Sequence, residues 1–355
     1  MDFQLRDPSK TASSLRTWLT DVRGLVDVEV GNPTIPAGTG ASNETVLFDA
    51  TWSGPAGPEQ HHLVARIAPT SYVVFPDDTF ALQFHVMRAL AAASSVPMAR
   101  MHWFEPDTAW FGAPFWIMDR VAGQIPSDTP PYASTGWLAE ATPEQQHRAW
   151  VSGVRALAGV HTTPLADLSL PSGLLPTPDD PLAAEIDRYE RFLAWAEEDK
   201  PFELARDALA WLRRNQPSAP AGGPALCWGD ARLSNLIYQD FEVAAVLDWE
   251  MATVGDPLLD LGWWIFADET LTTGAGLGLR RLPGFPSREE TAALWRSATG
   301  RSTDNLDYFE VFAGLRFTVI MVRMGKLIVD MGFMPDTFPY DNLVSQGLHR
   351  VLSRV

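Results

Sequence analysis

Apolar residues follow two different periods along this chain. Short runs rich in β-branched and aromatic residues, bounded by Gly and Pro, predict strands at 45–52, 62–68 and 116–121. Elsewhere apolar residues recur at helical spacing, and this pattern dominates from about residue 143 onward. We expect helices at 11–23, 79–93, 144–161, 181–199, 202–214, 288–298 and 306–331.

The change of period predicts two lobes. A chain of 355 residues exceeds the roughly 250–300 residues at which one hydrophobic core stops growing. We therefore expect an α+β protein with a small β-rich lobe at 1–120 and a larger, mostly helical lobe at 121–355.

Composition narrows the classes of function. The net charge of −17, without a cluster of Lys and Arg, disfavours binding to nucleic acids and to anionic membranes. The single cysteine, Cys227, excludes an intrachain disulfide and a multi-cysteine metal site. The N-terminal residues lack the pattern of a signal peptide, and no apolar run reaches the roughly 18 residues of a membrane span, so we expect a cytoplasmic protein.

One β-hairpin is predicted inside the helical region. Residues 236–238 and 243–248 read as its strands, joined by 239–242. Asp230 precedes the hairpin, Asn235 stands at its start and Asp248 at its end. Folding of the hairpin would bring these three side chains together.

Their residue types suit phosphoryl transfer. This reaction needs a metal ion that neutralises phosphate oxygens and a carboxylate that orients the attacking hydroxyl. Asp230 would accept or orient the hydroxyl proton, while the oxygens of Asn235 and Asp248 would coordinate Mg²⁺. Either piece of the pattern alone is common in turns, so the inference rests on their order along the chain.

The stretch WGDARLSNLIY followed by VLDWE resembles the catalytic and metal loops of the aminoglycoside phosphotransferase and choline kinase-like superfamily, which is similar to protein kinases. The segments GDPLLDL at 255–261 and LPGFPSREE at 282–290 resemble the phosphotransferase-like domain associated with acyl-CoA dehydrogenases. The resemblance covers most of the chain and implies a two-lobed protein-kinase-like fold that uses ATP and Mg²⁺.

The resemblance also implies roles in the first lobe. Residues Gly40, Ala41, Ser42 and Asn43 would cover the ATP phosphates, and Arg66 would replace the usual phosphate-binding lysine. The adenine hinge would be formed by Met118, Asp119 and Val121.

Two positions depart from the family pattern. Trp228 replaces the usual histidine two residues before the catalytic aspartate, and an indole N–H can donate a hydrogen bond but cannot accept a proton. Gln83 stands where a glutamate partner of the phosphate-binding cation is expected, so it would hydrogen-bond to Arg66 without an ion pair.

Several other residues allow more than one interpretation. Arg232 would contact either the γ-phosphate or an anionic substrate, or else form a surface salt bridge. Asp260 is expected to brace the catalytic loop through hydrogen bonds, His161 to be a core or capping histidine, and Trp263 and Trp264 to pack in the core.

These observations predict an ATP- and Mg²⁺-dependent phosphotransferase acting on a hydroxyl group of a small molecule. The acceptor would be hydroxyacyl-CoA-like or otherwise aminoglycoside-like. The alternative is a nucleotide-binding pseudokinase with a regulatory or partner-binding role, suggested by Trp228 and the missing glutamate.

Overall fold

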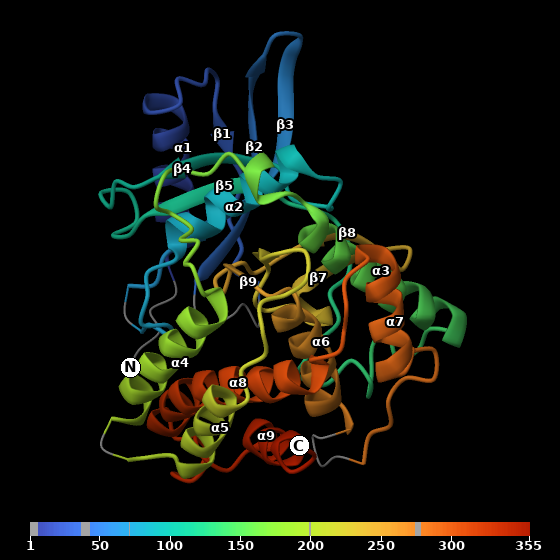
Figure 1. The fold of residues 1–355 in the computed structure, drawn as a ribbon. Coiled ribbons are helices and arrows are strands. Elements are labelled where there is room, and N and C mark those ends of the chain that lie inside the picture. The colour runs from blue at the N-terminus through green and yellow to red at the C-terminus, as the bar shows by residue number, and fades with distance from the viewer. Residues whose placement is uncertain (1–5, 37–42, 71, 199, 274–277) are drawn as a thin grey trace. The chain divides into compact units, whose positions relative to one another are not determined.

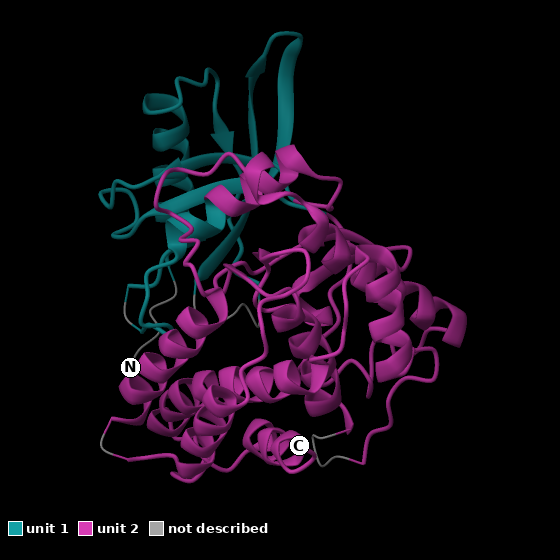
Figure 2. Ribbon diagram, viewed as in Figure 1, with its two compact units in different colours: residues 1–84, 99–121 teal, residues 85–98, 122–355 magenta. Residues whose placement is uncertain are grey.

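The computed structural model describes residues 6–36, 43–70, 72–198, 200–273 and 278–355. It divides into two compact units, shown in Figure 2. Unit 1 comprises residues 1–84 and 99–121, and unit 2 comprises residues 85–98 and 122–355. The boundary passes through helix α2, Phe80–Ala93.

Unit 1 is built on a five-stranded antiparallel sheet with the order β1-β2-β3-β5-β4. Burial alternates along β2, which places apolar side chains on one face, where they pack with Trp18 of helix α1. Asp7 caps α1 by accepting the backbone N–H groups of Ser9 and Lys10. The elements are α1 Pro8–Asp21, β1 Glu29–Val30, β2 Glu44–Gly54, β3 Gly57–Ile67, β4 Met101–Glu105 and β5 Phe115–Asp119.

Unit 2 is mostly helical. Its helices are α3 Pro143–Thr162, α4 Pro181–Glu197, α5 Glu203–Arg214, α6 Leu258–Leu271, α7 Arg288–Thr299, α8 Leu306–Asp330 and α9 Leu343–Leu352 (Figure 1). Helix α6 is buried almost all round, which agrees with its mostly apolar sequence. It approaches α8 closely at Gly262, where an added Cβ would lie 2.7 Å from the backbone of Phe309.

Two small antiparallel sheets in unit 2 position the candidate site. Strand β6, Ala225–Cys227, pairs with β9, Thr253–Gly255, and β7, Leu236–Gln239, pairs with β8, Glu242–Val246. The second pair is the predicted hairpin, closed by Asp240 and Phe241, which both have positive φ as a two-residue type I′ turn demands. The segments 228–235 and 247–252 connect these two sheets.

The prediction of a small β-rich lobe followed by a helical lobe is confirmed. The described helices include none that is both long enough and apolar enough to span a membrane. The assignment of nucleotide binding to residues 1–120 and of catalysis to residues 121–355 stays a prediction.

Candidate active site

Asp230 lies in the loop after β6 and is only 6% exposed. Its Oδ1 accepts hydrogen bonds from Trp263 Nε1 at 2.8 Å and Arg232 Nε at 2.9 Å. Its Oδ2 accepts from Asn235 Nδ2 at 2.7 Å and from the same Arg232 nitrogen at 3.0 Å. Buried carboxylates require such partners, because an uncompensated charge in the interior is costly.

Asn235 and Asp248 lie beside this carboxylate. The Asn235 side chain donates to both the backbone oxygen and Oδ2 of Asp230, and its own backbone oxygen accepts the N–H of Leu247 at 2.9 Å. That bond holds Leu247, the residue before Asp248, against the loop that carries Asp230 and Asn235. Asp248 has a φ of 59°, an uncommon conformation that Asp tolerates better than most residues and that often marks functional sites. The structure thus brings the three predicted polar residues of unit 2 to one place.

Trp228 takes over a bracing role at this site. Its buried indole N–H donates to the backbone oxygens of Leu247 at 2.7 Å and Asp248 at 3.0 Å. The tryptophan at this position therefore supplies a hydrogen-bond donor that joins the two loops. The next residue, Gly229, has a φ of 95° and approaches Met251 so closely that a Cβ would lie 2.3 Å from its backbone oxygen.

Asp260 of α6 braces the loop that carries Asp230 through hydrogen bonds, as predicted. Its two oxygens accept the backbone N–H groups of Trp228 at 2.6 Å and Gly229 at 2.8 Å. The buried His161 lies 2.9 Å from the same carboxylate, and its Nδ1 receives the indole N–H of Trp295 at 2.9 Å. Because an indole nitrogen only donates, Nδ1 is the acceptor and Nε2–H donates to Asp260. His161 is therefore a buried core residue, as expected.

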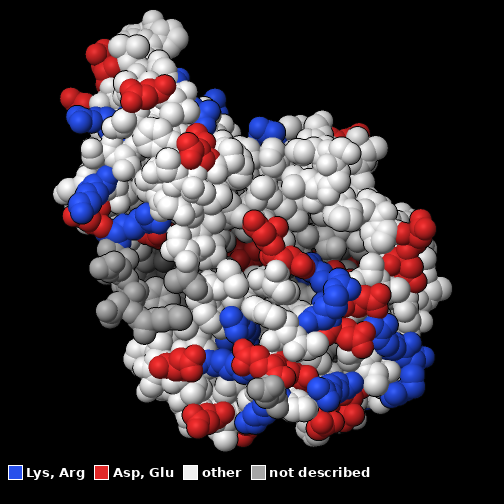
Figure 3. All heavy atoms as spheres, turned by 90° about the vertical axis from the view of Figure 1, so that its left-hand side faces the viewer, with Lys and Arg blue, Asp and Glu red and all other residues white. Residues whose placement is uncertain are grey.

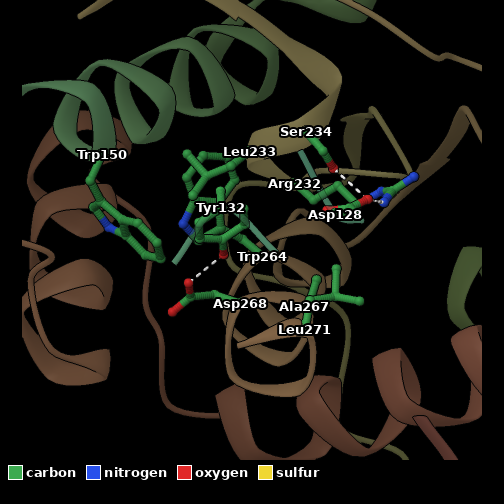
Figure 4. A pocket seen from close by; sticks show the side chains of 10 residues that line it. All are labelled: Asp128, Tyr132, Trp150, Arg232, Leu233, Ser234, Trp264, Ala267, Asp268 and Leu271. Carbon is green, nitrogen blue, oxygen red and sulfur yellow. Dashed lines mark hydrogen bonds and ion pairs between the residues drawn. The ribbon is translucent and has the colours of Figure 1, made fainter. Parts of the chain in front are cut away.

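Arg232 forms an ion pair with Asp230. It forms a second ion pair with Asp128, which also accepts a hydrogen bond from Ser234 (Figure 4). Burial acts to lower the pKa of Arg232, but the carboxylates of Asp230, Asp128 and Asp248 outweigh it and raise the pKa. Arg232 therefore forms the salt bridge that was one of its two expected roles, although its side chain is half-buried rather than on the surface. Whether it also contacts a phosphate or an anionic substrate stays a prediction.

A small cavity lies behind this corner of the loop. Its lining includes Tyr132, Leu233 and Trp264, and Figure 4 shows Tyr132 donating a hydrogen bond to Asp268. The cavity measures about 10 Å³, roughly the space of one water molecule, and is too small for a substrate.

The residues predicted in unit 1 lie on adjoining strands or beside them. Arg66 of β3 pairs with Trp116 of β5 and donates to Thr45 Oγ1 at 2.8 Å rather than to Gln83. Met118 is buried on β5, and Asp119 accepts a hydrogen bond from His102 at 2.6 Å. The predicted residues Asn43 and Val121 are respectively buried and half-buried, whereas Gly40, Ala41 and Ser42 lie outside the described residues.

The oxygen donors of unit 2 suit Mg²⁺. This ion is usually held by one or two protein oxygen ligands together with phosphate and water. The Asp248 carboxylate and the Asn235 amide provide such hard donors, and the amide nitrogen of Asn235 is already committed to Asp230. No cluster of three or more His, Cys, Asp or Glu side chains able to hold a metal is found in the described part of the chain.

Two of the three arginines at 280, 281 and 288 form ion pairs within unit 2. Arg281 pairs with Asp268 at 2.6 Å, and Arg288 pairs with Glu310 and Asp307, whereas Arg280 is exposed. Figure 3 shows Lys and Arg interspersed with Asp and Glu on one face of the molecule. The prediction that nucleic acids are not bound stays a prediction.

Sequence reasoning missed three contacts of residues 229–232, the segment that contains Asp230. Trp263 was expected only to pack in the core; it is buried, as is Trp264, but its indole also binds Asp230. Arg316 of α8 is fully buried and donates to the backbone oxygen of Gly229 at 3.0 Å. The third is the pairing of Asp128 with Arg232. Nothing in the local sequence indicates these contacts, because the partners are far apart along the chain.

A model of the phosphotransferase enzyme family matches residues 34–294. The chain belongs to this family. Its curated relatives include a probable acyl-CoA dehydrogenase, IBR3, from Arabidopsis thaliana, which is 28% identical over 66% of the chain. Acyl-CoA dehydrogenase family member 11 from Gallus gallus is 30% identical over 64% of the chain. The aligned regions are 28% and 29% of the lengths of these relatives, so the chain spans less than a third of either.

Solved structures of the phosphotransferases share the fold. A candidate aminoglycoside phosphotransferase from Ralstonia eutropha superposes with a TM-score of 0.70 at 23% identity, covering 96% of this chain and 98% of that one. The GDP complex of aminoglycoside 2′-phosphotransferase-IIIa gives a TM-score of 0.57 at 16% identity, with 98% of each chain covered. The predicted two-lobed kinase-like fold and the family resemblance are both confirmed.

Proposed function

We propose that this phosphotransferase transfers the γ-phosphoryl group of ATP, in the presence of Mg²⁺, to a hydroxyl group of a small molecule. The observation that carries the proposal is the arrangement of Asp230, Asn235 and Asp248 on two loops tied together by hydrogen bonds. Asp230 receives or orients the proton of the acceptor hydroxyl as its oxygen attacks the phosphorus.

Asn235 and Asp248 would hold Mg²⁺ through their side-chain oxygens. The ion supplies charge neutralisation at the phosphate oxygens. The protein's own part is positioning: Asp260 fixes the backbone before Asp230, and Trp228 ties the Asp248 segment to the same loop. A fixed arrangement of this kind avoids reorganisation during the reaction.

The nucleotide would use residues of unit 1. In this proposal Gly40, Ala41, Ser42 and Asn43 cover the phosphates and Arg66 contacts their oxygens. The backbone at Met118, Asp119 and Val121 would meet the adenine ring. Arg66 suits this role because a guanidinium offers paired donors to phosphate oxygens.

The acceptor we favour is a hydroxyacyl-CoA-like alcohol. Relatives named as acyl-CoA dehydrogenases contain a region similar to this chain, which supports an acceptor from acyl-CoA chemistry. The aminoglycoside phosphotransferases among the solved structures support the fold alone, so an aminoglycoside-like acceptor ranks second. A cytoplasmic location fits either acceptor.

Release of ADP tests the proposal. The parent protein is incubated with Mg-ATP and, separately, with hydroxyacyl-CoA, aminoglycoside and choline acceptors, and phosphorylated product is identified by ³¹P NMR. Asp230→Asn serves as the variant without the catalytic carboxylate. Product that depends on Asp230 supports the proposal; turnover that persists in Asp230→Asn contradicts the role given to this residue.

One observation favours a second candidate, a nucleotide-binding pseudokinase. Arg232 Nε lies within 3.0 Å of both oxygens of Asp230 and occupies the edge that an acceptor hydroxyl would approach. If the ion pair persists with nucleotide bound, the protein would bind ATP without turning it over. ATP binding by calorimetry, combined with no phosphorylated product from any acceptor, would support this candidate.

A further inference from the structure

Trp263 contacts the catalytic carboxylate from the core of unit 2. It lies on α6, is 2% exposed, and its indole N–H donates to Asp230 Oδ1 at 2.8 Å. An indole nitrogen is a donor only, so this bond has one possible direction. The side chain of Asn235 holds the other oxygen, Oδ2, at 2.7 Å.

These two neutral donors leave one edge of the carboxylate for another partner. That edge is taken by Arg232, whose Nε is 2.9 Å from Oδ1 and 3.0 Å from Oδ2. If Arg232 moves away, Trp263 and Asn235 still hold one oxygen each, and the carboxylate keeps its orientation. An acceptor hydroxyl could then take the place of the guanidinium.

The indole ring is itself held in place by α8. The Arg316 guanidinium carbon lies 4.9 Å from the centre of the ring, and Phe317 stacks on it at 5.2 Å with an interplanar angle of 28°. Arg316 also donates to the backbone oxygen of Gly229, the residue before Asp230. Helix α8 therefore fixes both the loop and the indole that holds its carboxylate.

We propose that Trp263 is a positioning residue, which fixes the Asp230 carboxylate so that the edge facing Arg232 is presented to the acceptor. The inference rests on the function proposed above. It assigns to Trp263 no contact with substrate or nucleotide. Loss of the indole donor should therefore reduce turnover without changing the affinity for ATP.

The adjacent residue provides a matched control. Trp264 is 1% exposed on the same helix, and its Nε1 has no hydrogen-bond partner among the residues that the structure describes. Trp263→Phe and Trp264→Phe remove the same atoms from buried positions, but only the first removes a hydrogen bond to a carboxylate. Thermal unfolding of both variants reports the shared effect of packing.

ADP release from Mg-ATP is measured for the parent and both variants, with water as acceptor and with any acceptor that the parent phosphorylates. Loss of a hydrogen bond to a charged group predicts a fall in kcat of roughly 10- to 100-fold for Trp263→Phe, with KM for ATP unchanged. Trp264→Phe should have the same kcat and the same KM for ATP as the parent. An unchanged kcat in Trp263→Phe, an equal fall in both variants, or a rise in KM alone would overturn the proposal.

A spectrum separates failure of this inference from failure of the proposed function. The protein is labelled with ¹⁵N-tryptophan, and the indole peak missing from Trp263→Phe is identified. We expect this peak to move in Asp230→Ala; if it stays in place, the contact does not exist and the positioning role is overturned. A parent that releases no ADP under any condition overturns the proposed function, and the positioning role with it.

Discussion

Trp228 offers a direct test of how the segment with Asp248, the proposed metal ligand, is attached to the loop with Asp230, the proposed catalytic residue. Its indole N–H bridges the backbone oxygens of Leu247 and Asp248 at 2.7 and 3.0 Å, and the residue is 1% exposed. Trp228→Phe keeps an aromatic ring at this position but removes the donor. The backbone oxygens of two half-buried residues then lose this hydrogen-bond partner.

The expected decrease in the free energy of unfolding of Trp228→Phe follows from these contacts. Leaving buried polar groups without a partner costs about 1–3 kcal/mol in the free energy of unfolding. The smaller ring also leaves a cavity, and Trp249→Phe measures that contribution, because Trp249 is fully buried and its indole bond to Val246 is long, at 3.3 Å. We expect Trp228→Phe to lose about 1–2 kcal/mol more than this control.

Two measurements check the prediction. Urea unfolding followed by circular dichroism gives the free energy of unfolding for parent and both variants. Calorimetric titration gives the affinity for Mg-ATP. If displacement of Asp248 weakens the binding free energy by roughly 1.4 kcal/mol, the affinity of Trp228→Phe should fall about tenfold. Equal stability of the two variants, together with parental affinity in Trp228→Phe, would refute the bracing role.

Two further predictions concern buried carboxylates. Burial raises the pKa of Glu310 from 4.5 to about 7 despite its pairing with Arg288, so its ionisation costs folding free energy as pH rises through this range. Between pH 5.5 and 8 the free energy of unfolding of the parent, measured with urea, should fall by about 2 kcal/mol more than that of Glu310→Gln. Parallel plots of this free energy against pH for the two proteins would contradict the prediction. Asp260→Asn replaces one of the two oxygens that accept backbone N–H groups. We therefore expect the free energy of unfolding in the same assay to fall by about 2–3 kcal/mol. Asp256→Asn should lose less, because the Asp256 side chain accepts one backbone N–H; equal losses would argue against the bracing role of Asp260.

The longer elements were predictable from the sequence. Helices such as α3 and α8 have many apolar residues at one spacing, and the hairpin β7–β8 is bounded by polar residues. The strands β6 and β9 have three residues each, too few for a period to be recognised. Their strand conformation comes from pairing with each other, 25 residues or more apart, rather than from local preference.

The candidate site was also predictable only where its residues lie close together in the sequence. Asp230, Asn235 and Asp248 lie within one short stretch, so their residue types and spacing carry the signal. Trp263 and Arg316 reach the same loop from separations of 33 and 87 residues, where no spacing rule applies. Their apolar neighbours predict burial, but only the packing of α6 against α8 aims the two polar groups at the loop.

Binding of ATP with and without Mg²⁺, compared between the parent and Asp248→Asn, tests the central claim most directly. The account predicts that Mg²⁺ strengthens ATP binding by the parent, and that Asp248→Asn loses this effect and releases no ADP. Calorimetry measures the affinities, and unfolding curves establish that the variant is folded. Absence of ATP binding by the parent, or an undiminished effect of Mg²⁺ in Asp248→Asn, would contradict the account.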